Sequence, residues 1–301
     1  MTFKYRFLLG ACRLVHAQKM MQQPPEKLKA MFEKRVGVPV VYPFEDPELT
    51  ITAETVQDCP VQAFRHRKPC GRACIYLVGG GMLKYPIKRQ ARSLIKWAKR
   101  TNRDIFLPYY PLAYGHTMMD VYAMLYELYK KLLGEYPAEN IAVFGGSSGG
   151  FHALGLVSYI NERGEGLPVP GKVYAGSPGT AYATDRERER AEQLDATDVI
   201  MSTKAMENVF AVMTGGRTDI PDYLLYLQKG KYTGLKNAYL SFGGDEIFSA
   251  CAESIRDRLA SFGTDVTLEV AEGLYHSYAG MPLVKEAMPG FENLMQYLAE
   301  E

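Results

Sequence analysis

The chain has 301 residues, 47% of them hydrophobic, and its 35 basic and 34 acidic residues leave a net charge of +1. This length accommodates a large core in about two domains or in one large α/β unit. The near-neutral charge provides no footprint for nucleic acid, so we expect no nucleic-acid partner. No apolar stretch approaches the roughly 20 residues of a membrane helix, so we expect no membrane span and, by default, a cytoplasmic protein.

Five cysteines lie scattered along the chain, and this odd number favours reduced thiols over a disulfide framework. They are Cys12, Cys59, Cys70, Cys74 and Cys251. Cys70 and Cys74 are close in sequence, but no His or second Cys pair completes a zinc pattern there. We therefore expect no metal and no organic cofactor.

The first hundred residues contain helices and then short strands. Residues 1–35 predict two amphipathic helices, because apolar residues recur along them and Pro24-Pro25 interrupts the pattern. Leu49–Val56 and Val61–Arg67 predict two strands separated by Asp58-Cys59-Pro60.

From residue 74 onward, short apolar runs alternate with helical stretches. Such runs are typical of strands buried on both faces of a parallel sheet. The predicted strands are 74–78, 105–107, 141–144, 173–175 and 239–242, and the predicted helices are 118–133, 151–163, 249–262 and 291–299. The alternation predicts an open α/β sheet.

One interval between two predicted strands is too long for a simple connection. Residues 182–230 are charged and contain helical runs at 185–194 and 202–213. We interpret this interval as an inserted lid and expect residues 1–40 to contribute to the same cap. The α/β core would then comprise residues 41–181 and 231–301.

The strongest chemical signal is a glycine-rich turn between a predicted strand and a predicted helix. Gly145-Gly146-Ser147-Ser148-Gly149-Gly150 contains G-x-S-x-G in two registers, with Ser147 or Ser148 as the central residue. This context is that of a nucleophile elbow, which presents a serine hydroxyl at a helix N-terminus. We prefer Ser147, because it follows the strand sooner and leaves two glycines for helix–strand packing. A phosphate-binding P-loop is excluded, because no Lys-Ser/Thr follows.

Three further elements complete a hydrolytic set. Gly79-Gly80-Gly81 follows an earlier strand, where backbone N–H groups can converge on an oxyanion. Asp245 and Glu246 follow the strand predicted at 239–242, and His276 comes later in the chain. A lone histidine is more often structural, but the order serine, acid, histidine is that of the α/β-hydrolases.

These motifs resemble the hormone-sensitive-lipase-like branch of the α/β-hydrolases, the acetyl esterase and carboxylesterase group, over roughly residues 70–285. The HGGG motif of the branch corresponds to Val78–Gly81, its GDSAGG elbow to Gly145–Gly150, and its Tyr-Arg-Leu-Ala-Pro segment to Tyr110–Tyr114. The resemblance implies an α/β-hydrolase fold: a mostly parallel central sheet flanked by helices, with a helical cap.

The resemblance also favours one of the two candidate triad acids, and it shows where this sequence differs from the motifs of the branch. Some members place a Glu in a Gly-x-x-Glu-(Ile/Val)-Leu turn, which favours Glu246 and leaves Asp245 as its rival. Val78 replaces the His of HGGG, which puts the usual anchoring of that loop in doubt. Gly146 and Ser148 replace the Asp and Ala of the elbow, which changes the surroundings of the serine.

The sequence thus predicts a serine hydrolase that cleaves carboxylic esters with short-to-medium acyl groups. Ser147 would attack, His276 would take its proton, and Glu246 or Asp245 would orient the imidazole. N–H groups of Gly80, Gly81 and Ser148 would hold the oxyanion. The expected partner is a small-molecule ester, and a homodimer is the default assembly.

Three other functions remain open at this stage. An amidase, arylformamidase or peptidase could use the same triad, because leaving-group preference depends on the pocket. A non-catalytic ligand-binding protein could retain the fold. A partner protein could bind a surface of methionines, although these fit lid packing better. The methionines are Met20, Met21, Met31, Met201, Met206 and Met213.

Overall fold

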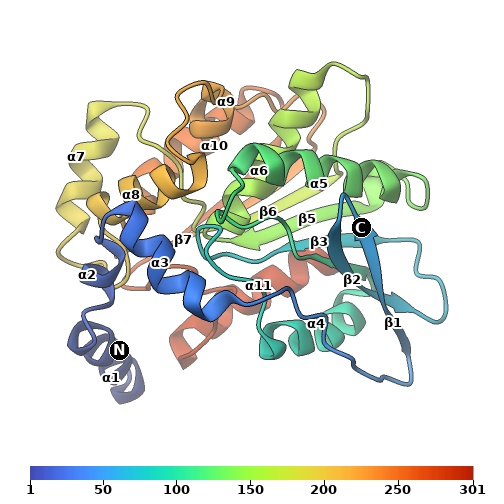
Figure 1. Cartoon of the computed structure of the whole chain (residues 1–301), viewed down its shortest axis with the longest axis horizontal. Coiled ribbons are helices and arrows are strands. Elements are labelled where there is room, and N and C mark those ends of the chain that lie inside the picture. Colours follow the sequence, from blue (N-terminus) through green and yellow to red (C-terminus); the bar gives the residue numbers. More distant parts are fainter. Residues whose placement is uncertain (301) are drawn as a thin grey trace.

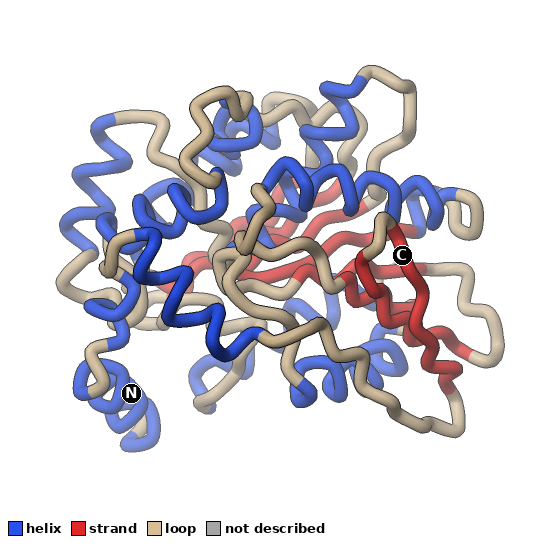
Figure 2. Tube along the Cα trace, in the orientation of Figure 1, coloured by secondary structure: helices blue, strands red, loops and turns tan. Residues whose placement is uncertain are grey.

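A single eight-stranded sheet forms the centre of the molecule (Figures 1 and 2). The computed structural model describes residues 1–300, and of Arg35 only the backbone. β2 pairs antiparallel with both of its neighbours, and every other pairing is parallel. In spatial order the strands are β1 (Leu49–Val56), β2 (Cys59–His66), β4 (Asp104–Pro108), β3 (Ala73–Leu77), β5 (Ile141–Gly146), β6 (Lys172–Gly176), β7 (Asn237–Gly243) and β8 (Asp265–Ala271). The expected mostly parallel α/β sheet is confirmed.

Helices cover both faces of this sheet (Figure 1). One face carries α4 (Lys88–Thr101) and α11 (Met288–Ala299), which pack on each other. The other carries α5 (Met118–Leu133), α6 (Ser148–Arg163) and α10 (Ala252–Ala260). The residues of β4 and β6 are all buried, so these strands have apolar neighbours on both faces. Among residues 1–300, no helix is long and apolar enough to cross a membrane.

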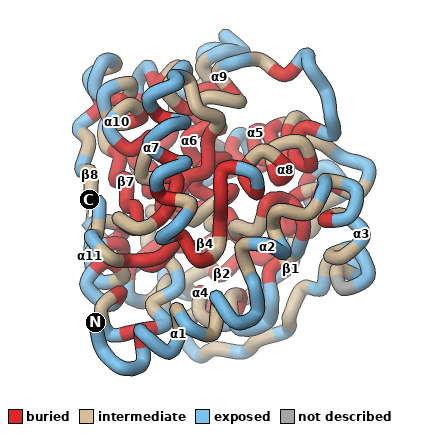
Figure 3. Tube along the Cα trace, turned by 90° about the vertical axis from the view of Figure 1, so that its left-hand side faces the viewer, coloured by how far each residue is buried: buried red, intermediate tan, exposed pale blue. Residues whose placement is uncertain are grey.

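The inserted interval and the N-terminus supply the remaining helices. Residues 182–230 form α7 (Asp185–Leu194), α8 (Thr203–Thr214) and α9 (Asp222–Leu225). The N-terminal helices are α1 (Phe3–Leu14), α2 (Ala17–Met21) and α3 (Pro25–Val36). α2 and α3 pack against α8. α1 is largely exposed (Figure 3).

Polar contacts join these two parts of the chain. Gln18 Nε2 donates to the carbonyl oxygens of Asp195, Asp198 and Met201 at 2.8 to 3.0 Å. Tyr5, by contrast, donates its hydroxyl to the carbonyl oxygen of Gly273 at 2.5 Å. α1 therefore lies against the loop after β8, whereas α2 and α3 adjoin the inserted helices. The division of the chain into core and cap stays a prediction.

The structure differs from the sequence predictions at several elements, including the N-terminal helices, β2, α4 and β8. The first 35 residues form three helices, because His16 adopts a left-handed conformation that ends α1. β2 begins two residues early, because Gln57 and Asp58 both have positive φ and form a tight hairpin turn. α4 was not predicted. β8 was also not predicted, because this edge strand alternates polar and apolar residues and lacks a continuous apolar run.

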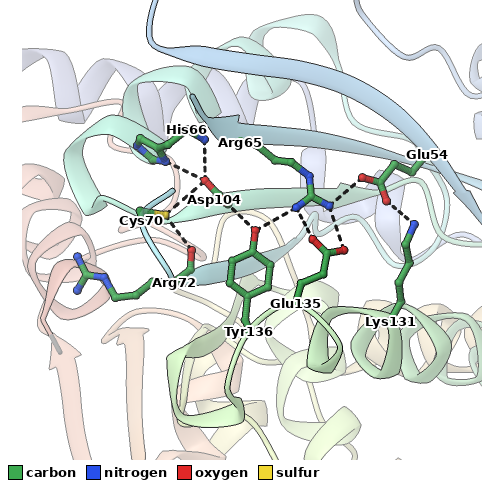
Figure 4. Close-up of polar contacts among 9 residues, drawn as sticks. All are labelled: Glu54, Arg65, His66, Cys70, Arg72, Asp104, Lys131, Glu135 and Tyr136. Atoms are coloured by element: carbon green, nitrogen blue, oxygen red, sulfur yellow. Dashed lines mark hydrogen bonds and ion pairs between the residues drawn. The ribbon is translucent and has the colours of Figure 1, made fainter. Parts of the chain in front are cut away.

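A buried carboxylate at the N-terminal end of β4 forms hydrogen bonds with two other segments of the chain (Figure 4). Asp104, the first residue of β4, is 5% exposed. Its Oδ1 accepts the backbone N–H of His66 at 2.7 Å and lies 2.9 Å from His66 Nδ1. Its Oδ2 accepts the hydroxyl of Tyr136 at 2.6 Å. One side chain thus joins β2, β4 and the segment after α5.

We predict that Asp104→Ala lowers the free energy of unfolding by about 3 kcal/mol, because it leaves a buried hydroxyl and a backbone N–H without partners. Asp104→Asn should cost less, since it keeps one acceptor oxygen. Urea denaturation measures both values. Glu292→Ala, which removes an exposed ion pair with Arg100, is the control and should leave stability unchanged. An Asp104→Ala protein as stable as the wild type would contradict this role.

Candidate active site

Ser147 stands at a sharp turn between β5 and α6. Its backbone has φ 56° and ψ −130°, and positive φ is uncommon for a residue with a side chain. Its N–H donates to the carbonyl oxygen of Gly176 at 2.8 Å, which ties the turn to β6. Ser148 is already helical and buried. The elbow conformation therefore belongs to Ser147, the register that the sequence analysis preferred.

Glycines around this turn allow the backbone of α6 to approach β3. A Cβ added to Gly149 would lie 2.0 Å from the carbonyl oxygen of Leu77, and one added to Gly145 would lie 2.5 Å from the same atom. A Cβ on Gly79 would lie 2.5 Å from the carbonyl oxygen of Gly146. Any side chain at these three positions would push the loop after β3 away from the serine.

Two side chains form hydrogen bonds with the loop after β3, in which Val78 stands at the position of the histidine of HGGG. Ser148 Oγ accepts the N–H of Gly81 at 2.9 Å. The hydroxyl of Tyr110 donates to the carbonyl oxygen of Val78. Burial raises the pKa of Tyr110, and a hydrogen bond from the Ser148 side chain opposes that rise. Ser148 and Tyr110 therefore anchor both ends of the Val78–Gly81 loop.

This arrangement bears on the expected oxyanion donors. The N–H of Gly81 already has an acceptor in Ser148 Oγ. An oxyanion beside Ser147 would have to share that N–H with Ser148. Among residues 1–300, the N–H of Gly80 has no acceptor, and the N–H of Ser148 is free because Ser148 is the first residue of α6. The assignment of Gly80, Gly81 and Ser148 as oxyanion donors stays a prediction.

Glu246, rather than Asp245, lies beside the histidine. Glu246 Oε2 is 2.5 Å from His276 Nδ1, and Glu246 Oε1 accepts the N–H of Gly243 at 2.8 Å. Glu246 is fully buried. The carboxylate of Asp245 makes no hydrogen bond or ion pair with any residue in the described part of the chain. The turn after β7 thus directs the second of its two acids inward.

The charge of Glu246 controls the proton affinity of His276. Burial by itself lowers the pKa of the imidazole, because it penalises the charged form. The charge and hydrogen bond of Glu246, together with the charge of nearby Asp198, outweigh this effect and raise the pKa of His276 above its usual value. The pair therefore favours a proton on Nδ1, with Nε2 as the nitrogen that faces away from the acid.

Asp198, from the inserted interval, is a second buried acid near this pair. Its Oδ2 accepts the N–H of Ile247 at 3.1 Å, and its Oδ1 accepts the N–H groups of Ile200 and Met201 at 2.8 Å. Burial raises the pKa of Asp198 to about 6, and the nearby His276 opposes that rise. Asp198 thereby joins the inserted interval to the turn that carries Glu246. The sequence carried no signal for it.

Ser147 and His276 line one cavity of about 360 Å³. Within the described residues no hydrogen bond joins the two side chains. Such contacts are often loose without substrate. Much of the remaining lining is apolar and comes from the N-terminal helices, the inserted interval and the loop after β8. Six methionines contribute to it, namely Met20, Met21, Met201, Met206, Met213 and Met281.

Five of the six methionines considered as a partner-binding surface therefore face this cavity, and Met31 does not belong to its lining. Of these five, Met20 and Met21 belong to α2, Met206 and Met213 belong to α8, and Met201 precedes α8. This placement agrees with the simpler interpretation, in which the methionines pack the helices over the sheet. An unbranched thioether side chain adapts readily to an irregular apolar surface, so the same residues suit a cavity that accepts apolar groups.

One group of metal-ligating side chains occurs elsewhere in residues 1–300 (Figure 4). The donor atoms of His66, Cys70 and Asp104 lie within 4.8 Å of one another. Burial raises the pKa of the Cys70 thiol, so the protonated form is favoured. Cys70 Sγ lies 3.4 Å from Asp104 Oδ1 and 3.2 Å from the carbonyl oxygen of Arg72. Asp104 Oδ1 thus contacts both the Cys70 thiol and the His66 imidazole.

Comparison with known proteins places this site in context. A family model described as having the alpha/beta hydrolase fold matches residues 74–280. Esterase LipU of Mycobacterium tuberculosis is 24% identical over 237 residues, which are 76% of this chain and 78% of LipU. An FAD-linked oxidoreductase, pytB of Aspergillus terreus, is 25% identical over 275 residues, 86% of this chain but only 33% of that protein.

Solved structures show the same fold. A putative esterase from Staphylococcus aureus superimposes with a TM-score of 0.78 at 20% identity, covering 92% of each chain. The structure of EstE5 soaked with p-nitrophenyl butyrate gives a TM-score of 0.79 at 18% identity, over 99% of this chain and 98% of EstE5. An esterase of the bacterial hormone-sensitive lipase family gives 0.73 at 18% identity, over 91% and 97%.

We predict that Glu246→Gln lowers the pKa of His276, because the substitution removes the negative charge that favours the imidazolium form. An NMR titration of the His276 ring measures this shift directly. Asp245→Asn is the matched control, since it removes a charge at the adjacent position and should leave the titration unchanged. Equal shifts in the two variants would contradict the assignment of Glu246 as the partner.

Proposed function

The chain belongs to the α/β-hydrolase family, and on that premise we propose that it is a serine hydrolase that cleaves carboxylic esters through an acyl-enzyme intermediate. The observation that carries this proposal is the convergence of three features on one cavity. These are the elbow serine Ser147, the buried pair of His276 and Glu246, and the glycine loop after β3. The esterase names of LipU and of the structural neighbours support the same reaction.

The geometry suits a two-step acyl transfer. His276, with Nδ1 engaged by Glu246, would use Nε2 to accept the proton of Ser147 as the hydroxyl attacks the ester carbonyl. The developing oxyanion would bind backbone N–H groups at the start of α6 and in the Gly79–Gly81 loop. His276 would then protonate the leaving alcohol. Water would attack the acyl-enzyme with His276 as base, which restores Ser147 and releases the acid.

The cavity supports short-to-medium acyl groups. Its volume of about 360 Å³ lies near the lower end of the range that small-molecule sites span. Its methionine-rich wall favours an apolar portion of the substrate. Cleavage of amides and peptides by the same residues is the alternative, and a comparison of matched ester and amide substrates distinguishes it from the proposal.

We predict that the wild-type protein hydrolyses p-nitrophenyl acetate and butyrate and that Ser147→Ala lowers kcat by roughly 10⁴-fold or more, because it removes the nucleophile. A fluorophosphonate probe should label the wild type and not this variant. Retained labelling in Ser147→Ala would contradict the assignment of the nucleophile. Absence of both turnover and labelling in the folded wild type would overturn the hydrolase proposal itself.

We further predict that Ser148→Ala lowers kcat by roughly tenfold while fluorophosphonate labelling at Ser147 persists, because the loop donors lose their anchor but the nucleophile remains. Steady-state kinetics on p-nitrophenyl butyrate measure the effect. Ser158→Ala is the matched control. It removes another buried serine of α6, which accepts the N–H of Lys231 at 3.0 Å, and should change stability without changing kcat. Full activity of Ser148→Ala would contradict the anchoring role.

A further inference from the structure

Lys84 is the one side chain with a fixed charge among the described residues that line the cavity. The lining includes His276 but no aspartate, glutamate or arginine. Lys84 follows the glycine loop by three residues but is not one of its expected oxyanion donors. A lone ammonium in a lining that is mostly apolar and has no carboxylate gives the cavity a local positive potential.

The side chain of Lys84 lies directly on the glycine loop. A Cβ added to Gly80 would lie 2.6 Å from Lys84 Cε and 2.9 Å from its Cγ, so the stem covers Gly80. Gly79 touches Ser147 in turn, with 3.0 Å between an added Cβ and the Ser147 Cβ. Since neighbouring Cα atoms are 3.8 Å apart, these contacts place Lys84 Cε within about 13 Å of Ser147 Cβ.

The Lys84 ammonium has no anionic partner among residues 1–300. Among the described residues no carboxylate lies within 4.0 Å of it, and none accepts a hydrogen bond from it. Lys99, by comparison, pairs with both Asp46 and Glu48 at 3.0 Å. The cavity opens to solvent, so Lys84 remains exposed, yet the surrounding protein partly desolvates the ammonium and lowers its pKa. A bound anion would compensate for that loss of hydration.

We propose that Lys84 forms an anion-binding subsite, through which the cavity selects carboxylic esters that carry a second, ionised carboxylate. This inference rests on the proposed ester hydrolysis and adds a substrate class to it. In the bound substrate the scissile carbonyl lies at Ser147, the apolar part contacts the methionine wall, and the carboxylate contacts the ammonium of Lys84. An exposed lysine that only covers the loop with its stem is the competing interpretation.

Pairs of esters that differ only in charge separate these interpretations. The first pair is 4-acetoxybenzoate and its methyl ester, with the carboxylate on the alcohol side. The second is mono-p-nitrophenyl adipate and its methyl ester, with the carboxylate on the acyl side. The readout is the ratio of kcat/KM for the anionic ester to that for its neutral partner. Comparing this ratio between variants cancels the intrinsic reactivity of each ester.

Lys84→Met keeps an unbranched apolar stem and removes the charge. In at least one pair we expect it to lower the ratio by roughly tenfold, which corresponds to the loss of one charge-assisted hydrogen bond. Most of the change should come from KM for the anionic ester, with kcat/KM for the neutral ester retained. Lys84→Arg should keep the preference. Lys88→Met is the matched control, because Lys88 is an exposed lysine of α4 outside the cavity lining, and it should leave the ratio unchanged.

Each other result counts against the inference in a distinguishable way. If Lys84→Met slows both members of each pair equally, the side chain only supports the loop. If the ratio is the same in wild type and Lys84→Met, no anion subsite exists. If the wild type cleaves neither member and a fluorophosphonate does not label Ser147, the proposed ester hydrolysis fails and the inference falls with it.

Discussion

The structure depends on the close approach of two backbone turns, one after β3 and one after β5. The turns meet through Gly79, Gly145 and Gly149, where a Cβ would lie 2.0 to 2.5 Å from a carbonyl oxygen. This contact is possible only without side chains, and it places the start of α6 beside the glycine loop. Parallel pairing of β3 with β5 brings both turns to the same edge of the sheet. The candidate active site therefore lies at the C-terminal ends of these parallel strands.

The helices outside the sheet turn this edge into a cavity. Methionines of α2 and α8 line the same cavity as Ser147. Asp198 connects the inserted interval to the turn that carries Glu246. The inserted interval therefore contacts both the wall of the cavity and the turn that carries the buried acid Glu246. The opposite edge of the sheet has a different role. There Asp104 joins β2, β4 and the segment after α5 through hydrogen bonds.

Much of the sheet and of the candidate site could be predicted from the sequence, because the information there is local. An apolar strand, a glycine-bracketed serine and a glycine-rich acidic turn each occupy fewer than about ten consecutive residues. The choice between Asp245 and Glu246 needed the structure, because it depends on which side of the turn faces His276. Asp198 and Tyr110 could not be assigned, because their contacts join segments far apart in sequence. Lys84 could not be assigned either, because its place in the cavity and its lack of an anionic partner among residues 1–300 depend on the folded structure.

Two substitutions in the family motifs are linked in space. Val78 stands in place of the histidine of HGGG, and Ser148 stands in place of the alanine of the elbow. In the structure Ser148 accepts the N–H of Gly81, and Tyr110 donates to Val78. The side chain at one departure from the family motifs thus forms a hydrogen bond with the loop that contains the other departure.

The most direct test of this account is to trap the covalent intermediate. Wild-type protein would be quenched in acid during turnover of p-nitrophenyl acetate, digested, and analysed by tandem mass spectrometry. The account predicts an added acetyl group on Ser147 within the peptide that spans β5 and α6. Acetylation of Ser148 instead, or turnover without any acylated residue in this peptide, would contradict it.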